Sequence, residues 1–267
     1  MFKDITIGQY YQTDSLLHRM DPRVKLIATF LYIISLFIVQ SWLGYLWAAA
    51  ALAVVIRLSR VPVHYIVRGM RSIVFLLLIT VGFNLFLTEG TPLIRFWRLT
   101  ITYEGLDFAS KMAVRLIFLI IGSSLMTLTT TPNQLTDGLE NVLGPLRRLH
   151  VPVHEISMMM SIALRFIPIL MEETDKIMKA QIARGADFEN GNLIQKAKNM
   201  IPLLVPLFIS AFRRANDLAM AMEARCYHGG DNRTQMKPLH YQSRDYIAYV
   251  VMWGYLAIAI IFRVVGI

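Results

Sequence analysis

The sequence predicts an all-α integral membrane protein with about five transmembrane helices and a cytoplasmic module of three helices, two of them long. Three observations lead to this class. Of the 267 residues, 55% are hydrophobic and only 17% are charged, whereas soluble globular proteins carry about 25% charged residues. Several charge-free apolar runs approach the roughly 17 to 25 residues that a helix needs to cross a bilayer. The segment 131–245 instead combines many charges with long helical patterns.

Five apolar runs are expected to cross the membrane, at residues 24–40, 42–56, 73–88, 116–130 and 246–262. The first follows Asp21, which suits the capping position of a helix, and Pro22, which suits its first turn. Trp42, Tyr45 and Trp47 indicate an interface level at the start of the second run. Because the second, third and fourth runs are a little short, tilt and helical flanks must complete these crossings.

The distribution of lysine and arginine predicts the orientation of the spans. Basic residues gather before the first span and after the second: Lys3, Arg19, Arg23, Lys25, Arg57, Arg60, Arg68 and Arg71. The loop 89–111 instead balances basic and acidic residues: Arg95, Arg98 and Lys111 against Glu89, Glu104 and Asp107. Because cytoplasmic flanks collect basic residues, the N-terminus and the 57–72 loop are expected in the cytoplasm. Five crossings then place 131–245 in the cytoplasm and the C-terminus outside.

This pattern divides the chain into three parts, which are an N-terminal membrane domain at 1–131, a cytoplasmic module at 132–235 and a C-terminal transmembrane helix within 236–267. The module is expected to hold three helices, at residues 132–149, 151–184 and 193–225. A turn at 186–192 makes the second and third run back on each other. Acidic and basic residues on the second helix indicate a solvated face with ion pairs along that helix: Glu172, Glu173, Asp175, Lys176 and Lys179.

An alternative is that the apolar parts of the second and third helices form a hairpin of two extra spans. The run in the third helix is only about 13 residues long, which is too short to cross a bilayer, and Pro202 and Pro206 interrupt it. The run in the second is longer but contains Arg165, and a charge at mid-bilayer costs several kcal/mol. Long helices at the membrane surface or against a partner are therefore the preferred interpretation.

The second and third helices end in matched sequences. Each places an alanine three residues before an Ala-Arg pair: Ala180, Ala183 and Arg184 in one, and Ala221, Ala224 and Arg225 in the other. A single such end would be ordinary helix termination, because arginine complements the helix dipole and Gly185 is a normal residue after a helix. The repetition instead indicates a pair of docking sites. The alanines leave space beside a guanidinium, whose planar fork matches a carboxylate in a partner's groove.

The length of the two helices predicts more than one partner. At 1.5 Å per residue, each helix is roughly 45 Å long. Because the helices run back on each other, the two arginines are expected tens of ångströms apart, roughly the length of such a helix. One small pocket could not bind both, so two copies of a partner, or two related partners, would take one each.

Other patterns give weaker indications. Methionines and large apolar residues form a stripe on the second helix, either as core or as a surface that accepts several partners: Met158, Met159, Met160 and Met171, with Ile156, Ile162 and Phe166. His150 and His154 are four residues apart, but Val151-Pro152 breaks the helix between them, so no metal site is expected. The basic residues are interspersed with acidic ones, so nucleic acid is not an expected partner.

The sequence lacks the motifs of the commonest nucleotide and hydrolase sites. It has no phosphate-binding loop of the Gly-x-x-x-x-Gly-Lys type, no His-Glu-x-x-His and no Gly-x-Ser-x-Gly. The five spans, with the boundaries above, also lack ionisable side chains at depth, which ion-coupled carriers usually contain. A non-catalytic subunit without a cofactor is therefore expected, and the alternative is a self-sufficient secondary carrier or membrane-embedded enzyme.

Five segments, in order and with specific spacing, are similar to one known family. They are His18-Arg19-Met20-Asp21-Pro22-Arg23-Val24-Lys25-Leu26, Thr130-Thr131-Pro132, Arg165-Phe166-Ile167-Pro168, Ala183-Arg184-Gly185 and Ala224-Arg225-Cys226. Over nearly its whole length, the chain resembles the transmembrane T component of energy-coupling factor transporters. The resemblance implies a scaffold in a prokaryotic plasma membrane, which joins two ABC-type ATPases to a small membrane protein, the S component, that captures a vitamin or a metal ion.

The resemblance also implies roles for particular residues. In that family two Ala-Arg-Gly motifs end the coupling helices, and each docks in one ATPase. Ala183, Arg184 and Gly185 would contact one ATPase, and Ala224, Arg225 and Cys226 the other. Cys226 stands where the family usually has glycine. The coupling helices would also face the S component, a role that suits the methionine stripe: Met158, Met159, Met160, Ile162 and Phe166.

Overall fold

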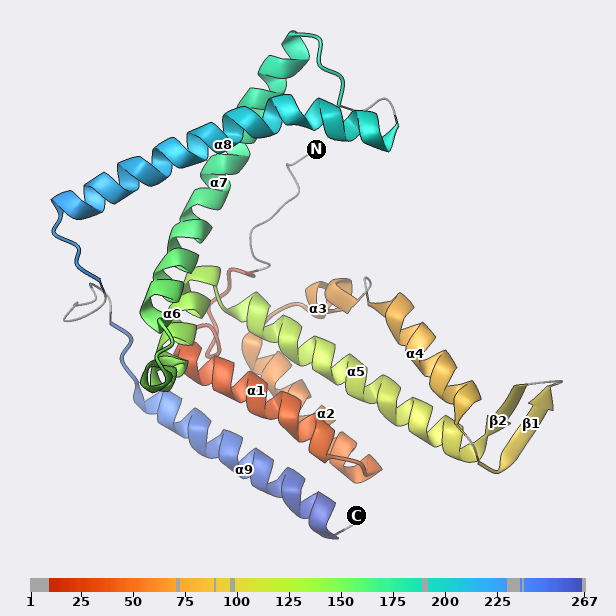
Figure 1. Cartoon of the computed structure of the whole chain (residues 1–267). Coiled ribbons are helices and arrows are strands. Elements are labelled where there is room, and N and C mark those ends of the chain that lie inside the picture. The colour runs from red at the N-terminus through yellow and green to blue at the C-terminus, as the bar shows by residue number, and fades with distance from the viewer. Residues whose placement is uncertain are drawn as a thin grey trace. The chain divides into compact units, whose positions relative to one another are not determined.

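The computed structural model describes residues 10–70, 73–88, 90–96, 99–188, 192–229, 236 and 238–265. Several residues used above to predict orientation lie outside these ranges: Lys3, Arg71, Glu89 and Arg98. The described chain is almost entirely helical (Figure 1). It forms two compact units, which meet in the sequence at 141/142 and again at 238/239. We call the unit that contains residues 8–141 and 239–267 the bundle unit, and the unit that contains residues 142–238 the arm unit.

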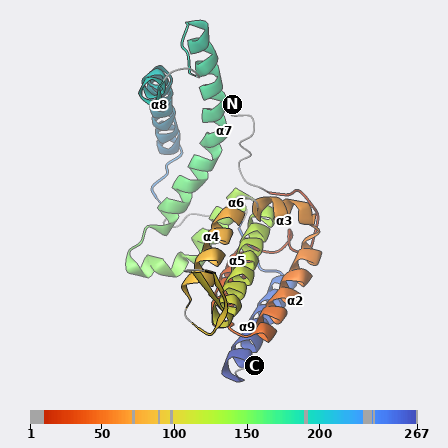
Figure 2. The ribbon, with the colours of Figure 1, turned by 90° about the vertical axis from the view of Figure 1, so that its right-hand side faces the viewer.

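Within the described residues, the bundle unit holds six helices before the first junction and one after the second. They are α1 (Pro22–Ile38), α2 (Trp42–Ser59), α3 (Val63–Met70), α4 (Val74–Leu87), α5 (Tyr103–Thr129), α6 (Pro132–Val142) and α9 (Ser243–Val265). Helix α1 packs against α5 and α9, and α5 also contacts α2, α3 and α4. Figure 2 shows the same bundle from the side. The expected cap at Asp21 is confirmed, because its side chain accepts a hydrogen bond from the Arg23 amide.

Three parts of the bundle unit differ from the prediction. Helix α3 was not predicted, and a two-stranded antiparallel hairpin, β1 (Pro92–Phe96) and β2 (Leu99–Thr102), replaces part of an expected loop. Helix α5 begins at Tyr103 and not near residue 116, because Thr102 caps it by accepting a bond from the Gly105 amide. Lys111 and Arg115 therefore belong to the same helix as the predicted fourth span and precede that span.

Cations from neighbouring helices bind the carbonyls at the ends of α1 and α5. Lys25, near the start of α1, donates to the Thr129 carbonyl at the end of α5 (2.9 Å). In the opposite direction, Arg115 of α5 donates to the Val39 carbonyl just after α1 (3.3 Å). Arg263 of α9 donates to the Ile38 carbonyl (2.9 Å). Because helix C-termini carry partial negative charge, these contacts stabilise antiparallel packing of α1 on α5.

Four described helices are long and apolar enough to cross a membrane: α2, α5, α7 (Val153–Ala183) and α9. Helices α1 and α4, with 17 and 14 residues, are shorter. Helix α7 meets this criterion, as the alternative of extra spans requires. Its partner in that alternative hairpin, α8 (Leu193–Ala224), is not among the four.

The arm unit consists of a short 3₁₀ helix η1 (Gly144–Leu149) followed by α7 and α8. The first predicted helix of the module therefore ends at Val142, because Gly144-Pro145 interrupts it. Gln181 of α7 donates to the Pro202 carbonyl of α8 (3.2 Å). Eight residues earlier on α7, Glu173 accepts from Ser210, which lies eight residues later on α8. The two helices are thus antiparallel over roughly 12 Å. Figure 1 shows that they cross and that their C-terminal ends point apart.

The crossing is fixed by an ion pair between the two long helices. Arg214 of α8 donates to the Glu173 carboxylate of α7 (2.9 Å). The sequence suggested an ion-paired face along the helix, but it did not predict this bond between the two helices. The hydrogen bonds of Glu173 go to Ser210 and Arg214. The side chains of Glu173 and Arg214 are 22% and 40% exposed, so the pair is partly screened by solvent.

Candidate docking sites at the ends of the two long helices

Helix α7 ends in a Schellman motif built around Arg184. Arg184 is the C-cap residue, and Gly185 follows with φ of +89°. The Gly185 amide donates to the Ile182 carbonyl (2.9 Å), and the Ala186 amide donates to the Gln181 carbonyl (3.0 Å). These two bonds define the motif and satisfy carbonyls that the helix leaves unpaired.

Helix α8 ends in the same motif, built around Arg225. The Cys226 amide donates to the Glu223 carbonyl (2.8 Å), and the Tyr227 amide donates to the Met222 carbonyl (3.1 Å). Cys226 has φ of +55°, so it adopts the left-handed conformation that glycine usually supplies. For a residue with a side chain, this conformation costs roughly 1–2 kcal/mol. Cysteine in place of glycine therefore leaves the hydrogen bonds of the helix end unchanged but adds strain.

The two arginines have equivalent surroundings. All six residues of the two motifs are exposed: Ala183, Arg184, Gly185, Ala224, Arg225 and Cys226. The backbone angles at Arg184 (φ −90°, ψ 5°) and Arg225 (φ −95°, ψ 12°) nearly coincide. Among the residues that the structure describes, no hydrogen bond or ion pair engages either guanidinium. Both are therefore free to bind an acidic group on another protein.

The two arginines lie at the same sequence separation from the two members of the Glu173–Arg214 ion pair. Glu173 and Arg214 are 41 residues apart, the same interval that separates Arg184 from Arg225. Each arginine follows its member of the ion pair by 11 residues. At 1.5 Å per residue, each lies roughly 16 Å along its helix from the pair. The two sites thus project by equal lengths from one crossing, on ends that point apart.

The predicted methionine stripe is split between exposed and half-buried positions. Met159 and Met160 are 58% and 37% exposed, whereas Met158, Ile162 and Phe166 are half-buried. A second apolar surface lies on α8, in and just after the short apolar run that the sequence placed at the membrane surface or against a partner. It consists of Ile201, Leu204, Val205, Phe208 and Phe212, each more than half exposed. Their spacing of three and four residues is the periodicity of one helix face.

His150 and His154 of the arm unit lie on either side of the break between η1 and α7. His150 ends η1, and α7 begins three residues later at Val153. Within the described ranges, no group of three histidine, cysteine, aspartate or glutamate residues could hold a metal ion.

Comparison with known proteins identifies the family. The family described as cobalt transport protein (CbiQ) matches residues 13–236 of this chain. A protein of Clostridium kluyveri, named energy-coupling factor transporter transmembrane protein EcfT, is 56% identical over 267 residues, which cover 99% of this chain and 98% of the relative. This chain belongs to the EcfT family.

Two further EcfT proteins show the same similarity. The one from Thermosediminibacter oceani is 53% identical over 256 residues, covering 96% of each chain. The one from Ruminiclostridium cellulolyticum is 53% identical over 245 residues, covering 92% of each. The resemblance seen in the sequence motifs is therefore confirmed. The chain is a membrane-embedded transport subunit of the energy-coupling factor type, from a family of bacterial transporters.

Proposed function

We propose that this EcfT chain couples ATP hydrolysis by two cytoplasmic ABC-type ATPases to an S component that captures a vitamin or a metal ion. The observation that supports the proposal most strongly is the equivalence of the two helix ends. Arg184 and Arg225 share a backbone conformation, are exposed and are unpaired among the described residues. Two exposed arginines with the same backbone conformation, on helix ends that point apart, suit two related binding grooves better than one (Figure 1).

Each guanidinium would bind a carboxylate in a groove of one ATPase. Ala183 and Gly185 beside Arg184, and Ala224 and Cys226 beside Arg225, leave room for the groove walls. Charge-assisted, two-pronged bonds between arginine and a carboxylate are among the strongest hydrogen bonds in proteins. Removing one interfacial arginine should cost on the order of 2–5 kcal/mol, partly because its partner carboxylate is left buried and unpaired.

The S component would dock on the apolar surfaces of the two long helices. The contact proposed from the sequence comprises Met158, Met159, Met160, Ile162 and Phe166 on α7. The exposed face of α8 from Ile201 to Phe212 would provide a second apolar contact. Flexible methionine side chains suit a surface that binds more than one partner. In this arrangement 1–131 and 236–267 lie in the plasma membrane, and the N-terminus and the module 132–235 face the cytoplasm.

The docking proposal is tested by Arg184→Ala, Arg225→Ala and the double variant in the complete transporter. Lys179→Ala is a matched control, because Lys179 is an exposed cation one turn before Arg184. Each arginine variant should insert normally, bind its ATPase at least about tenfold more weakly and lose most substrate uptake. The control should behave as the parent protein. Unchanged ATPase binding in the double variant would contradict the proposal, and uptake by the purified chain alone would favour a self-sufficient carrier.

The orientation can be tested with the chain's own thiol. Cys226 is the single cysteine of the sequence, and it is exposed at the end of α8. A membrane-impermeant maleimide should label it in inside-out vesicles and not in intact cells. Binding of the ATPases should slow this labelling, because the thiol adjoins Arg225. A Cys226→Ser, Val264→Cys variant should show the opposite sidedness, and labelling of Cys226 from outside would overturn the cytoplasmic placement.

A further inference from the structure

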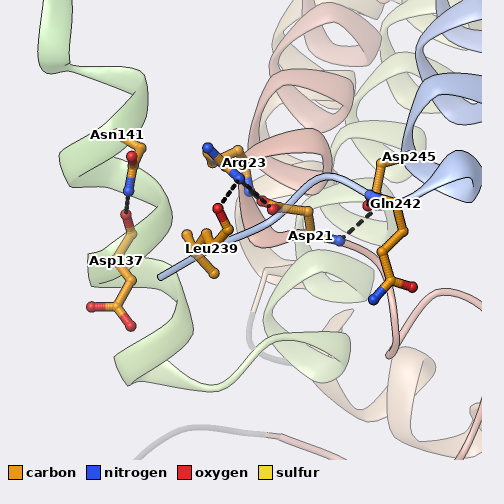
Figure 3. Close-up of polar contacts among 7 residues, drawn as sticks. All are labelled: Asp21, Arg23, Asp137, Asn141, Leu239, Gln242 and Asp245. Atoms are coloured by element: carbon orange, nitrogen blue, oxygen red, sulfur yellow. Dashed lines mark hydrogen bonds and ion pairs between the residues drawn. The ribbon is translucent and has the colours of Figure 1, made fainter. Parts of the chain in front are cut away.

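Both chain connections between the arm unit and the bundle unit start beside the first turn of α1. The first connection leaves the bundle unit at the end of α6. There a Cβ added to Gly138 would lie 3.1 Å from Pro22 Cβ and 3.2 Å from Leu26 Cδ1, so α6 and α1 are in close contact. Near the same end, the Asn141 side chain donates to the Asp137 carbonyl (2.9 Å) and closes the last turn of α6 (Figure 3).

The second connection re-enters the bundle unit at Leu239, and Arg23 holds it there. Arg23 Nη2 donates to the Leu239 carbonyl (3.0 Å), and its guanidinium lies 3.9 Å from the centroid of the Tyr241 ring. Figure 3 shows the Arg23 side chain between Asp21 and Leu239. We call residues 239–242, which precede α9, the return strap. One side chain of α1 thus binds the strap by a hydrogen bond and by cation–π attraction.

Asp21 fixes the Arg23 side chain in this position. Its carboxylate accepts from Arg23 Nε (3.0 Å) and from Arg23 Nη2 (2.7 Å). The two side chains are only 3% and 13% exposed, so the pair is little screened by solvent. Removal of either partner would leave an uncompensated buried charge. The pair therefore resists displacement of the strap more strongly than an exposed ion pair would.

Asp245 ties the start of α9 to the start of α1. It is 1% exposed. Its Oδ1 accepts from the Asp21 amide (3.0 Å), and its Oδ2 accepts from the Gln242 amide (2.8 Å). The carboxylate lies near the N-terminal ends of both helices, where the helix dipoles favour negative charge. The first turn of α1, the return strap and the first turn of α9 therefore form one continuous hydrogen-bonded group (Figure 3).

We propose that the first turn of α1, Asp21-Pro22-Arg23, is the joint through which movement of the two long helices is transmitted to α1 and α9. The proposal rests on the coupling function proposed above. Because both connections are held at one turn, a force applied to either junction reaches the same end of α1. Arg23 is then a positioning residue, which keeps the strap and α1 moving together. Without Arg23, the return strap would move independently of α1, and ATP hydrolysis would transport little substrate.

The first experiment measures the joint without reference to transport. Hydrogen exchange of the complete transporter should show faster exchange across 239–245 in Arg23→Ala, by about tenfold. Arg19→Ala is the matched control, because Arg19 lies four residues earlier and pairs with Asp14 in solvent, with both side chains more than 60% exposed. The control should leave exchange of the strap unchanged. Unaltered exchange in Arg23→Ala would overturn the anchoring role.

The second experiment measures coupling. In proteoliposomes, Arg23→Ala should retain the ATPases and their hydrolysis but lower uptake about tenfold, so that more ATP is used per substrate. Arg23→Lys, which keeps the charge, should recover part of the ratio. A purely structural defect would lower hydrolysis and uptake in proportion, and that outcome would overturn the proposal. If Arg23→Ala is not recovered in membranes, Tyr241→Ala removes the ring contact and gives the same readings.

The contact at α6 gives an independent variant. Gly138→Ala should force α6 away from Pro22 and raise the ATP used per substrate, whereas Gly144→Ala should have no effect, because nothing lies within 4 Å of a Cβ at Gly144. Equal effects of the two variants would count against the joint. The two proposals fail separately, because loss of ATPase binding in Arg184→Ala and Arg225→Ala tests the docking sites alone. If Arg184→Ala and Arg225→Ala lose ATPase binding while Arg23→Ala leaves the ATP used per substrate unchanged, the docking sites are supported and only the joint is excluded.

Discussion

After helix α7 the left-handed residue is Gly185, and after helix α8 it is Cys226. Both helices nevertheless end with the same two hydrogen bonds and the same arginine backbone conformation. Glycine adopts the left-handed backbone freely, whereas cysteine adopts it at a cost. The difference shows that the same Schellman bonds, and the same backbone conformation of the arginine, form with either residue at the turn. The glycine at the end of α7 therefore affects the stability of the turn, and the arginine is the residue for which we propose the same function at both ends.

The largest predicted effects come from replacing each arginine by lysine. Because the two ends have the same geometry, Arg184→Lys and Arg225→Lys should weaken ATPase binding by similar factors, at least about tenfold each. Lysine keeps the charge but cannot offer two parallel donors to a carboxylate. Binding titrations with each ATPase would measure the two losses. Tolerance of lysine at one end only would break the equivalence of the two sites.

Gly185→Cys makes the end of α7 resemble the end of α8. With φ of +89° at this position, the new side chain should destabilise the helix end by about 1–2 kcal/mol. Exchange of the Ala186 amide should become faster, and ATPase binding at Arg184 should weaken by up to about tenfold. Gly144→Cys is the control, since no positive φ is found there. If Gly185→Cys changed neither the exchange of the Ala186 amide nor ATPase binding, the turn would tolerate any residue.

Glu173→Gln removes the charge that holds the two helices at their crossing. The pair is partly exposed, so the loss of stability should be about 1 kcal/mol or less. A small fall in the thermal unfolding temperature, with equal weakening of both ATPase contacts, would show that the crossing positions the two ends together. Glu172→Gln, at the exposed neighbouring position, should have no effect. Weakening at a single end would show that each site is positioned by its own helix alone.

Cys226→Gly should have the smallest effect, and in the stabilising direction. Glycine removes the strain of the left-handed conformation, and the gain is expected to be about 1 kcal/mol or less. Exchange of the Tyr227 amide should slow, while ATPase binding stays unchanged because Arg225 is unaltered. A clear loss of binding in Cys226→Gly would show that the thiol itself contacts the partner.

The sequence predicted best those features that depend on neighbouring residues. Apolar runs located α2 and α9 within a few residues, Asp21-Pro22 located the start of α1, and Arg184 and Arg225 were recognised at the ends of the long helices. These signals are local, because hydropathy, capping and helix termination act over one or two turns. The pairing of the two ends was also visible, since repetition within a sequence requires no knowledge of the fold.

Features that depend on distant residues were missed. The start of α5 mixes charged and apolar residues, and two of its charged side chains bond residues outside α5: the Trp42 indole donates to Asp107 (2.9 Å), and Arg115 donates to the Val39 carbonyl. The bond between Glu173 and Arg214 was not predicted, because the two residues are 41 positions apart in the sequence. Helix α3 and the hairpin are too short to produce a periodicity that distinguishes them from loops.

The cations that bind the end of α1 arrive late in synthesis. Arg115 follows the Val39 carbonyl that it binds by 76 residues, and Arg263 follows the Ile38 carbonyl by 225. At about 5–20 residues per second, these intervals correspond to roughly 4–15 s and 11–45 s on the ribosome. Until then, water or lipid headgroups must solvate those carbonyls. Helix α1 therefore completes its hydrogen bonds only after α9 has been made.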